Sequence, residues 1–203
     1  MSIFYVADTH FGHENIIKLC KRPFTSVAEM NEALIENWNK RVKGGDRVYI
    51  LGDMFYKTVD AEGILDRLKG EKHLIIGNHD ASWLEEYTVE HEGAEALPHK
   101  SYRFVKSKRD LSAYFKSVSQ ILQITDGDKA SVLCHYPLLT WKHESRLYMI
   151  HGHLHDNISD PFFHHLTENE RILNAGVEIN GYAPVTFLEL LENNRIFKER
   201  QAE

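Results

Sequence analysis

Short apolar runs alternate with helical patterns over the first eighty residues, and this alternation constrains the fold more than any other feature of the sequence. The runs at 3–7, 47–51 and 72–76 are typical of buried strands. Apolar residues recur at helical spacing over 27–42 and again over 59–68. Strand, helix, strand, helix, strand predicts a parallel α/β core with right-handed crossovers.

The rest of the chain is less uniform. The segment 81–128 is irregular and rich in charge, whereas 130–134 and 146–150 are strand candidates. We expect 185–191 to close the domain and the charged end, 193–203, to be peripheral. A chain of 203 residues is expected to form one domain covering residues 1–203.

Composition limits the class of protein. Hydrophobic residues make up 42% and charged residues 27%, the balance of a soluble globular chain. The net charge of −6 argues against a general nucleic-acid coat, although a local basic groove stays open. The basic run at 100–109 could face phosphate, or could be a solvated strand or loop. Cys20 and Cys134 are expected to be reduced thiols. No signal peptide or membrane-spanning stretch is visible, so we expect a cytoplasmic protein that does not bind membranes.

Polar clusters follow five of the predicted strands. In open α/β sheets, ligands bind outside the carboxyl ends of the strands, so clusters far apart in sequence can meet in one cleft. The clusters are DTH at 8–10, GD at 52–53, GNHD at 77–80, His135, and GHLH at 152–155.

The side chains in these clusters are carboxylates, an amide and imidazoles, with no thiolate, which suits Mn, Fe, Zn or Ni. Residues i and i+2 of a strand share a face, so Asp8 and His10 could reach one metal. The same holds for His153 and His155 if that segment is extended; if the backbone turns there, the two could serve two adjacent ions. A glycine begins three of the clusters, just before the ligand candidates, and would let the chain turn sharply and approach a bound group.

In order and spacing, the five clusters closely resemble the motifs of the calcineurin-like metallophosphoesterases: DxH, GD, GNH with an acidic residue, a lone His, and GHxH. The resemblance implies an α/β fold, a four-layer sandwich of two mixed sheets flanked by helices. The segments DTHFGH at 8–13 and NGYAPV at 180–185 are similar to a small bacterial or phage subgroup.

The resemblance also implies a dinuclear metal centre in which Asp53 bridges two divalent ions. A shared carboxylate offsets the repulsion between ions about 3.5–4 Å apart. Mn²⁺ is the expected metal, with Fe, Zn or Ni as alternatives. One ion would be held by Asp8, His10, Asp53 and His155, and the other by Asp53, Asn78, His135 and His153.

By the same resemblance His79 is the general acid, and Asp80 could orient it. The chain departs from the protein Ser/Thr phosphatases, whose GDxVDRG block carries an arginine that grips phosphate. Here the block reads GDMFYK at 52–57, which argues against a phosphoprotein phosphatase.

Other residues must then contact the phosphate, and three are candidates. Asn78 offers a neutral amide, which leaves room for an anionic substrate. His13 could face the metals or the phosphate, or could instead cap or pack the next helix. Arg22 could make a bidentate phosphate contact, or could be a surface arginine beside a turn. Trp141 could stack a base or anchor its loop, and we expect His151 to point away from the centre.

The sequence therefore predicts a dinuclear metal-dependent phosphoesterase for phosphomonoesters or phosphodiesters of the nucleotide type. A DNA or RNA nuclease is an alternative, although nucleases of this fold usually carry extra domains. A second alternative is a non-catalytic protein-binding module. Such a module is expected to lose ligands or the general acid, whereas here all seven ligand positions and His79 carry the residues of the family pattern.

Overall fold

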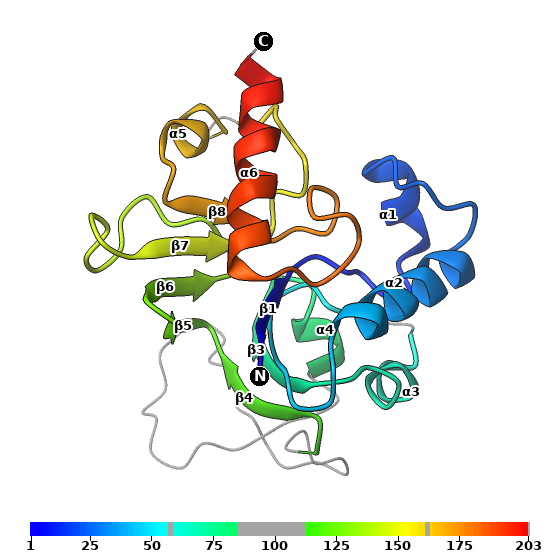
Figure 1. Ribbon diagram of the computed structural model, residues 1–203. Coiled ribbons are helices and arrows are strands. Elements are labelled where there is room, and N and C mark those ends of the chain that lie inside the picture. Colours follow the sequence, from blue (N-terminus) through cyan, green and yellow to red (C-terminus); the bar gives the residue numbers. More distant parts are fainter. Residues whose placement is uncertain (57–58, 85–112, 161–162, 203) are drawn as a thin grey trace, which may run out of the picture.

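The computed structural model describes residues 1–56, 59–84, 113–160 and 163–202 (Figure 1). The basic run at 100–109 and much of the irregular 81–128 segment lie outside the described residues.

One sheet comes from the alternating half of the chain. Its strands are β1 (Ile3–Val6), β2 (Arg47–Leu51), β3 (Glu71–Ile75) and β4 (Phe115–Ser119), paired in that order. All three pairings are parallel. The adjacent strands β1 and β2 are mostly apolar on both faces, as expected where a parallel sheet is covered on both sides. The prediction of a parallel core is therefore confirmed.

The second sheet is mixed. Its strands are β5 (Ile121–Asp126), β6 (Lys129–Cys134), β7 (Tyr148–His151) and β8 (Ile172–Asn174). β5 and β6 form an antiparallel pair, and the other pairings are parallel. Among the described residues, the antiparallel contact of the first sheet is one isolated bridge between Tyr5 and Val185.

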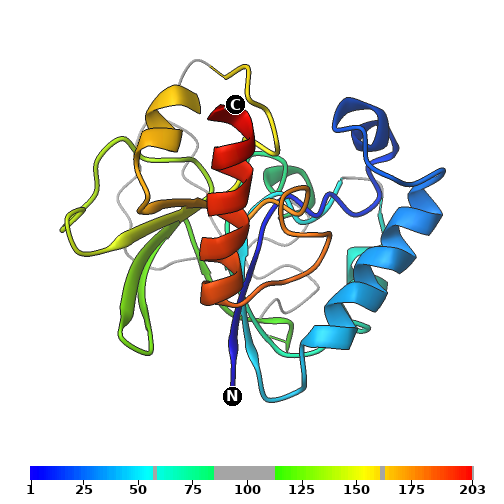
Figure 2. The ribbon, with the colours of Figure 1, turned by 45° about the horizontal axis from the view of Figure 1, so that its top comes forward.

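Helices cover the two sheets in layers (Figures 1 and 2). Buried residues of four helices pack on the outer face of the first sheet, and those of α5 pack on the outer face of the second. The C-terminal helix α6 packs against β8 and β1. The helices are α1 (Glu14–Leu19), α2 (Val27–Arg41), α3 (Ala61–Leu65), α4 (Ala81–Leu84), α5 (Phe163–Glu168) and α6 (Phe187–Ala202).

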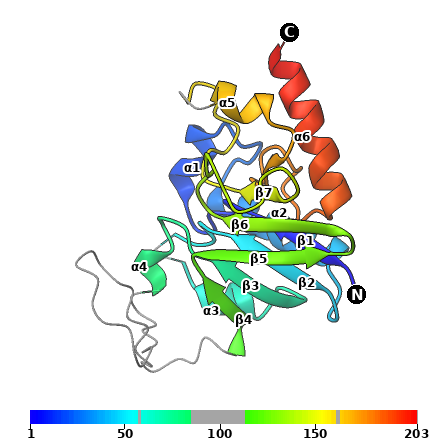
Figure 3. The ribbon, with the colours of Figure 1, turned by 90° about the vertical axis from the view of Figure 1, so that its left-hand side faces the viewer.

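The core between the sheets is built from alternate residues of facing strands. Tyr5, Leu51 and Ile75 from the first sheet pack with Leu133 and Ile150 from the second. The intervening residues of the first sheet face the helices instead. Since side chains alternate across a strand, each sheet contributes to two apolar layers. Figure 3 shows the two sheets stacked, and the predicted four-layer α/β sandwich is confirmed.

The charged C-terminal end is not peripheral, contrary to expectation. It belongs to α6, and Asn194 within it is buried. Val185 makes the bridge to β1, and the helix begins two residues later. Thr186 and Glu189 provide the signal for this start, because the Glu189 carboxylate accepts hydrogen bonds from the Thr186 backbone N–H and hydroxyl at 2.9 and 2.8 Å.

Among the described helices, each is too short or too polar to cross a membrane.

Candidate metal centre

The five polar clusters converge at one end of the two sheets. They follow β1, β2, β3, β6 and β7, the strands whose carboxyl ends meet there. Backbone hydrogen bonds tie neighbouring clusters together: Asp8 N donates to Gly52 O at 3.0 Å, and Gly152 N donates to His135 O at 2.9 Å. The fold therefore brings the five clusters together at one end of the sheets.

The backbone at this end is strained at the predicted ligands. Asp8, His10, Asp53, His153 and His155 all have positive φ, between 50° and 71°. Non-glycine residues rarely adopt this conformation, and it persists only where the surroundings impose it. β1 ends at Val6, so Asp8 and His10 converge through a turn and not, as expected, along an extended strand. The GHLH segment turns as well, which was the second of the two arrangements considered for it.

Two motif glycines are required by close packing against the ligands. Gly52 has a φ of +86°, and a Cβ built on it would lie 2.4 Å from His135 Nδ1. A Cβ on Gly152 would lie 2.7 Å from an Asp8 carboxylate oxygen. Any larger residue at these positions would displace a ligand, which explains why glycine stands before the ligand candidates.

Three donors gather on one side of the centre. Asp8, His10 and His155, called here the first donor group, offer ligand atoms that all lie within 4.8 Å of one another. The rings of His10 and His155 are stacked with centroids 5.1 Å apart. Asp8 and His10 are buried and His155 is half-buried, so this group is largely shielded from solvent.

Three more donors gather on the other side. Asn78, His135 and His153 form the second donor group, in which Asn78 Oδ1 lies 3.0 Å from both His135 Nε2 and His153 Nδ1. His135 is buried, but Asn78 is exposed and His153 is half-buried. The second group is therefore more open than the first.

Asp53 lies between the two groups. Its Oδ2 atom is 3.6 Å from His10 Nε2 and 3.6 Å from His135 Nε2. Its other oxygen accepts a hydrogen bond from the His79 backbone N–H at 2.8 Å, which fixes the carboxylate. Asp53 is therefore placed where its carboxylate could bind an ion held by either donor group.

The chemistry of these donors fits divalent cations. In the described part of the chain, His10 Nε2 is a buried atom with no hydrogen-bond partner, and Asp53 Oδ2 is 3.6 Å away. Burial lowers the pKa of His10 well below its usual range and also lowers those of His135 and His153, so the imidazoles are neutral and can donate a lone pair. Burial raises the pKa of Asp8 to about 8. A cation would offset the cost of ionising this buried carboxylate.

His79 and His13 lie beside the first group in different environments. The His79 side chain is 41% exposed, and its Nε2 is 4.0 Å from Asp53 Oδ2. His13 is buried, stacks on Tyr56 with centroids 4.0 Å apart, and places Nδ1 3.4 Å from His10 Nδ1. It precedes α1 without a capping hydrogen bond from its side chain. His13 therefore supports the His10 ring from behind.

Arg22 is neither a surface residue nor free to grip phosphate. It is buried, and its guanidinium donates to the backbone carbonyls of Asp8 and Thr9 at 2.7 and 2.9 Å. Its Nε and Nη2 both donate to Glu178 Oε1, and Nη1 also contacts the Met30 sulfur. These contacts use all five N–H groups, so the predicted phosphate contact is wrong and Arg22 positions the Asp8 loop.

Glu178 is a functional residue that the sequence analysis missed. Its side chain is 2% exposed, and Oε1 lies 2.9 Å from His155 Nδ1. A carboxylate in this place orients the ring and leaves Nε2 available as a ligand atom. Burial alone would lower the pKa of His155, but hydrogen bonds with Cys20 and Glu178 and the Asp8 charge raise it to about 11. Glu178 follows β8, a strand that the sequence did not predict, and belongs to none of the five clusters, so spacing gave no signal for it.

Asp80 organises the loops and does not orient the His79 ring. It is buried, and its two oxygens accept hydrogen bonds from the backbone N–H groups of Asp53, Met54 and Gly77 at 2.8–2.9 Å. A fourth bond comes from Trp83 Nε1 at 2.9 Å. None of the four reaches His79, so the predicted orienting role is replaced by a structural one. Asp80 holds the GD and GNH loops at a fixed separation.

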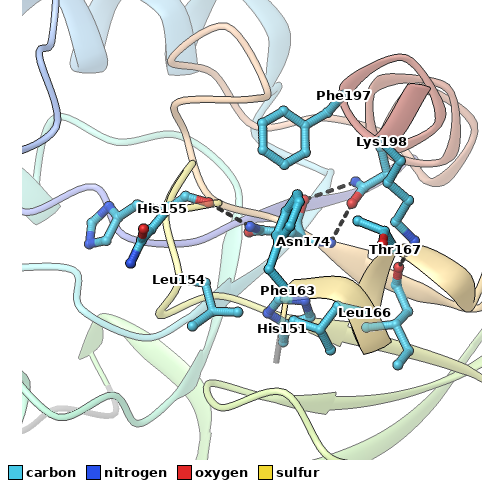
Figure 4. A pocket seen from close by; sticks show the side chains of 12 residues that line it. His151, Leu154, His155, Phe163, Leu166, Thr167, Asn174, Phe197 and Lys198 are labelled. Carbon is cyan, nitrogen blue, oxygen red and sulfur yellow. Dashed lines mark hydrogen bonds between the residues drawn. The ribbon is translucent and has the colours of Figure 1, made fainter. Parts of the chain in front are cut away.

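The His155 loop is also held from behind, as Figure 4 shows. Asn174, at the end of β8, donates to His155 O at 2.7 Å. Asn194 of α6 in turn accepts from Asn174 N and donates to Asn174 O. A small cavity lies behind this loop, lined in part by His151, Leu154 and Lys198. The C-terminal helix thus takes part in shaping the centre.

The remaining candidates have structural places. Trp141 is buried and donates to Leu147 O at 3.1 Å, so it anchors its loop. His151 is buried on the cavity side of the loop, with Nδ1 2.8 Å from Gly152 O. Both cysteines are free; Cys134 is buried, whereas Cys20 is half-buried close to His155 and Glu178.

Comparison with known proteins agrees with this centre. The family model described as calcineurin-like phosphoesterase matches residues 1–195. An uncharacterized protein of Methanocaldococcus jannaschii is 32% identical over 97% of this chain and 94% of its own length. The gene 66 protein of Mycobacterium phage D29 is 25% identical over 77% of this chain and 80% of its own. The relatives therefore include a phage protein, as expected, and also an archaeal one.

A solved structure shares the fold. The crystal structure of a protein of unknown function from Aquifex aeolicus aligns with a TM-score of 0.64 and 26% identity, covering 94% of this chain and 97% of that one. Family model, fold and centre agree: the chain belongs to the calcineurin-like phosphoesterase family, whose members are metal-dependent.

Proposed function

We propose that the chain is a dinuclear phosphoesterase that hydrolyses phosphomonoesters or phosphodiesters of the nucleotide type, acting on a small substrate in the cytoplasm. Mn²⁺ is the proposed metal, with Fe, Zn or Ni as alternatives. The observation that carries the proposal is the place of Asp53, whose Oδ2 is equally far from one histidine of each donor group. A carboxylate at that point suits two neighbouring cations.

Two divalent ions bound there would lower the pKa of a water molecule and neutralise charge that builds on the phosphoryl oxygens. The chain's own contribution is to hold the donors in place. Arg22 and Asp80 fix the loops that carry Asp8 and Asp53, and Glu178 orients His155. Asn78 is exposed and neutral, so it can meet an anionic substrate without repelling it.

His79 is the proposed proton donor to the leaving oxygen. Its backbone N–H is anchored on Asp53, and its side chain is the more exposed of the two histidines beside His10. A proton donor must reach the departing group and remain accessible to solvent for reprotonation. The buried His13 supports His10 and is less suited to this role.

The test combines metal analysis with a substrate panel. The purified protein should contain metal, and a chelator should abolish hydrolysis of nitrophenyl phosphate, with Mn²⁺ restoring it best. The panel should then span nucleotides, cyclic nucleotides, diesters and nucleic acids. Cleavage of nucleic acids alone would favour the nuclease. Full activity in a verified metal-free preparation would overturn the proposal, and absence of both metal and hydrolysis would favour a binding module.

A further inference from the structure

A groove adjoins the metal centre on the side of the GHLH segment at 152–155. Two proposed ligands, His153 and His155, form part of its wall. It continues along the end of α1, the loop after the GHLH segment and the end of α6. Its volume of about 630 Å³ is that of a small-molecule site. Any group attached to a phosphate at the metals and directed to this side would enter the groove.

Part of the wall is apolar. Leu19 and Ile158 are large hydrophobic residues that are 72% and 49% exposed, and both line the groove. Leu154 and Phe197 line it as well. Single exposed apolar residues need no explanation, but several from α1, α6 and a loop meeting beside a metal centre form a surface for an apolar group.

The charged part of the wall is acidic on balance. When His153 and His155 are neutral metal ligands, Lys21 is the one basic residue among the described lining residues, whereas Asp156 and Asp160 contribute two carboxylates. A wall of this kind repels an anionic group and accepts a neutral or cationic one. It opposes the path of a nucleic-acid strand, which carries a phosphate at every residue.

We infer that the groove holds the organic part of the substrate, and that this part carries no negative charge of its own. The inference rests on the proposed function and narrows it. A single phosphate ester of an uncharged or cationic group with an apolar face fits the groove. A nucleoside meets this description, whereas a polynucleotide does not.

Cys20 offers a readout that does not depend on catalysis. It is half-buried, lines the groove, and can be followed separately from the buried Cys134 by peptide mass spectrometry after iodoacetamide labelling. Three phosphonates of similar size and different charge are suitable probes: aminoethylphosphonate, propylphosphonate and phosphonoacetate. With Mn²⁺ present, the first two should slow labelling of Cys20 at concentrations about two- to fivefold lower than phosphonoacetate requires.

Two variants assign the effect to the groove. Asp156→Lys should reverse the order of the charged probes, and Asp128→Lys, in an exposed turn, should leave it unchanged. Leu19→Ser should weaken protection by propylphosphonate, and Leu188→Ser, equally exposed at 72% but on α6 outside the groove, should not. All four positions are on the surface, so the variants should fold.

The outcomes separate this inference from the proposed function. Protection with the predicted charge order in a protein that hydrolyses no ester supports the groove and rejects the enzyme. Hydrolysis of nitrophenyl phosphate with equal protection by all three probes, or with none, overturns the groove and leaves the enzyme intact. An Asp156→Lys variant that keeps the original order also overturns the groove.

Discussion

The two donor groups of the centre differ in how they are supported. The first group is supported by a buried ion pair between Glu178 and Arg22, which are 2.7 Å apart. Glu178 also contacts His155 at 2.9 Å. Behind the second group, the support for His135 is a backbone carbonyl, Leu51 O, at 2.8 Å from Nδ1.

Exposure follows the same division. The first group is enclosed by charged side chains that the fold already holds in place, whereas Asn78 and His153 of the second group reach solvent. Preorganised ligands bind a metal at lower entropic cost, and carboxylates behind a histidine raise its basicity. We therefore expect the first group to bind its ion more tightly. The second group should exchange its ion more readily and contact the substrate.

The largest effect should come from the residue that the two groups share. Asp53→Asn should reduce kcat/KM on nitrophenyl phosphate by more than the roughly 10–100-fold typical of residues behind a metal ligand. It should also lower metal content at both positions, whereas His153→Ala should lower it at one. Elemental analysis beside the kinetics checks this. A loss confined to one ion in Asp53→Asn would break the idea of a shared carboxylate.

The next largest effect separates proton donation from metal binding. His79→Asn should keep both ions and lose roughly 10²–10⁴-fold activity on esters with a basic alkoxide leaving group. Nitrophenyl esters, whose leaving group departs without a proton, should be much less affected. Measuring kcat/KM for both substrate types on one preparation of known metal content decides the matter. An equal loss on all substrates together with loss of metal would show that His79 is structural.

A smaller effect tests the support behind the first group directly. Glu178→Gln should weaken metal affinity at the first group by roughly 10–100-fold and leave the second unchanged. Since the change also removes the charge facing buried Arg22, thermal unfolding must be followed on the same sample. Glu192→Gln, an exposed residue paired with Arg195, is the matched control. Equal weakening of both ions by Glu178→Gln would remove the proposed difference between the groups.

The smallest effect is a pH dependence of stability in the metal-free protein. Burial raises the folded-state pKa of Asp8 from 3.8 to about 8. Its contribution to stability is therefore fully present below about pH 3.8 and is lost as the pH rises through 8. Bound cations favour the ionised carboxylate, so the gain in Tm on adding Mn²⁺ should increase from pH 6 to pH 8. A gain that is constant with pH would show that Asp8 does not face the metal.

Much of the centre could be predicted because it follows from strand ends. The strand 47–51 was predicted with its observed limits, and Asp53 follows it in the expected place. Apolar periodicity is a local signal, and it sufficed for the parallel sheet; the seven donors were implied by the family resemblance of the clusters at the strand ends, and the fold brings them together.

The parts that could not be predicted depend on contacts between distant residues. Arg22 and Glu178 are 156 positions apart, and nothing in their neighbourhoods marks them as partners. Asn174 and Asn194 support His155 from β8 and α6, where a polar residue would ordinarily be assigned to the surface. The left-handed backbone at Asp8 and His10 is likewise imposed by packing and not by the preference of those residues.

Anomalous diffraction from crystals soaked at increasing Mn²⁺ concentration tests the central claim most directly. The account predicts a first peak among Asp8, His10, Asp53 and His155 at low concentration. A second peak should follow at higher concentration among Asp53, Asn78, His135 and His153. A single site that never acquires a neighbour, or a first peak at the second donor group, would contradict it.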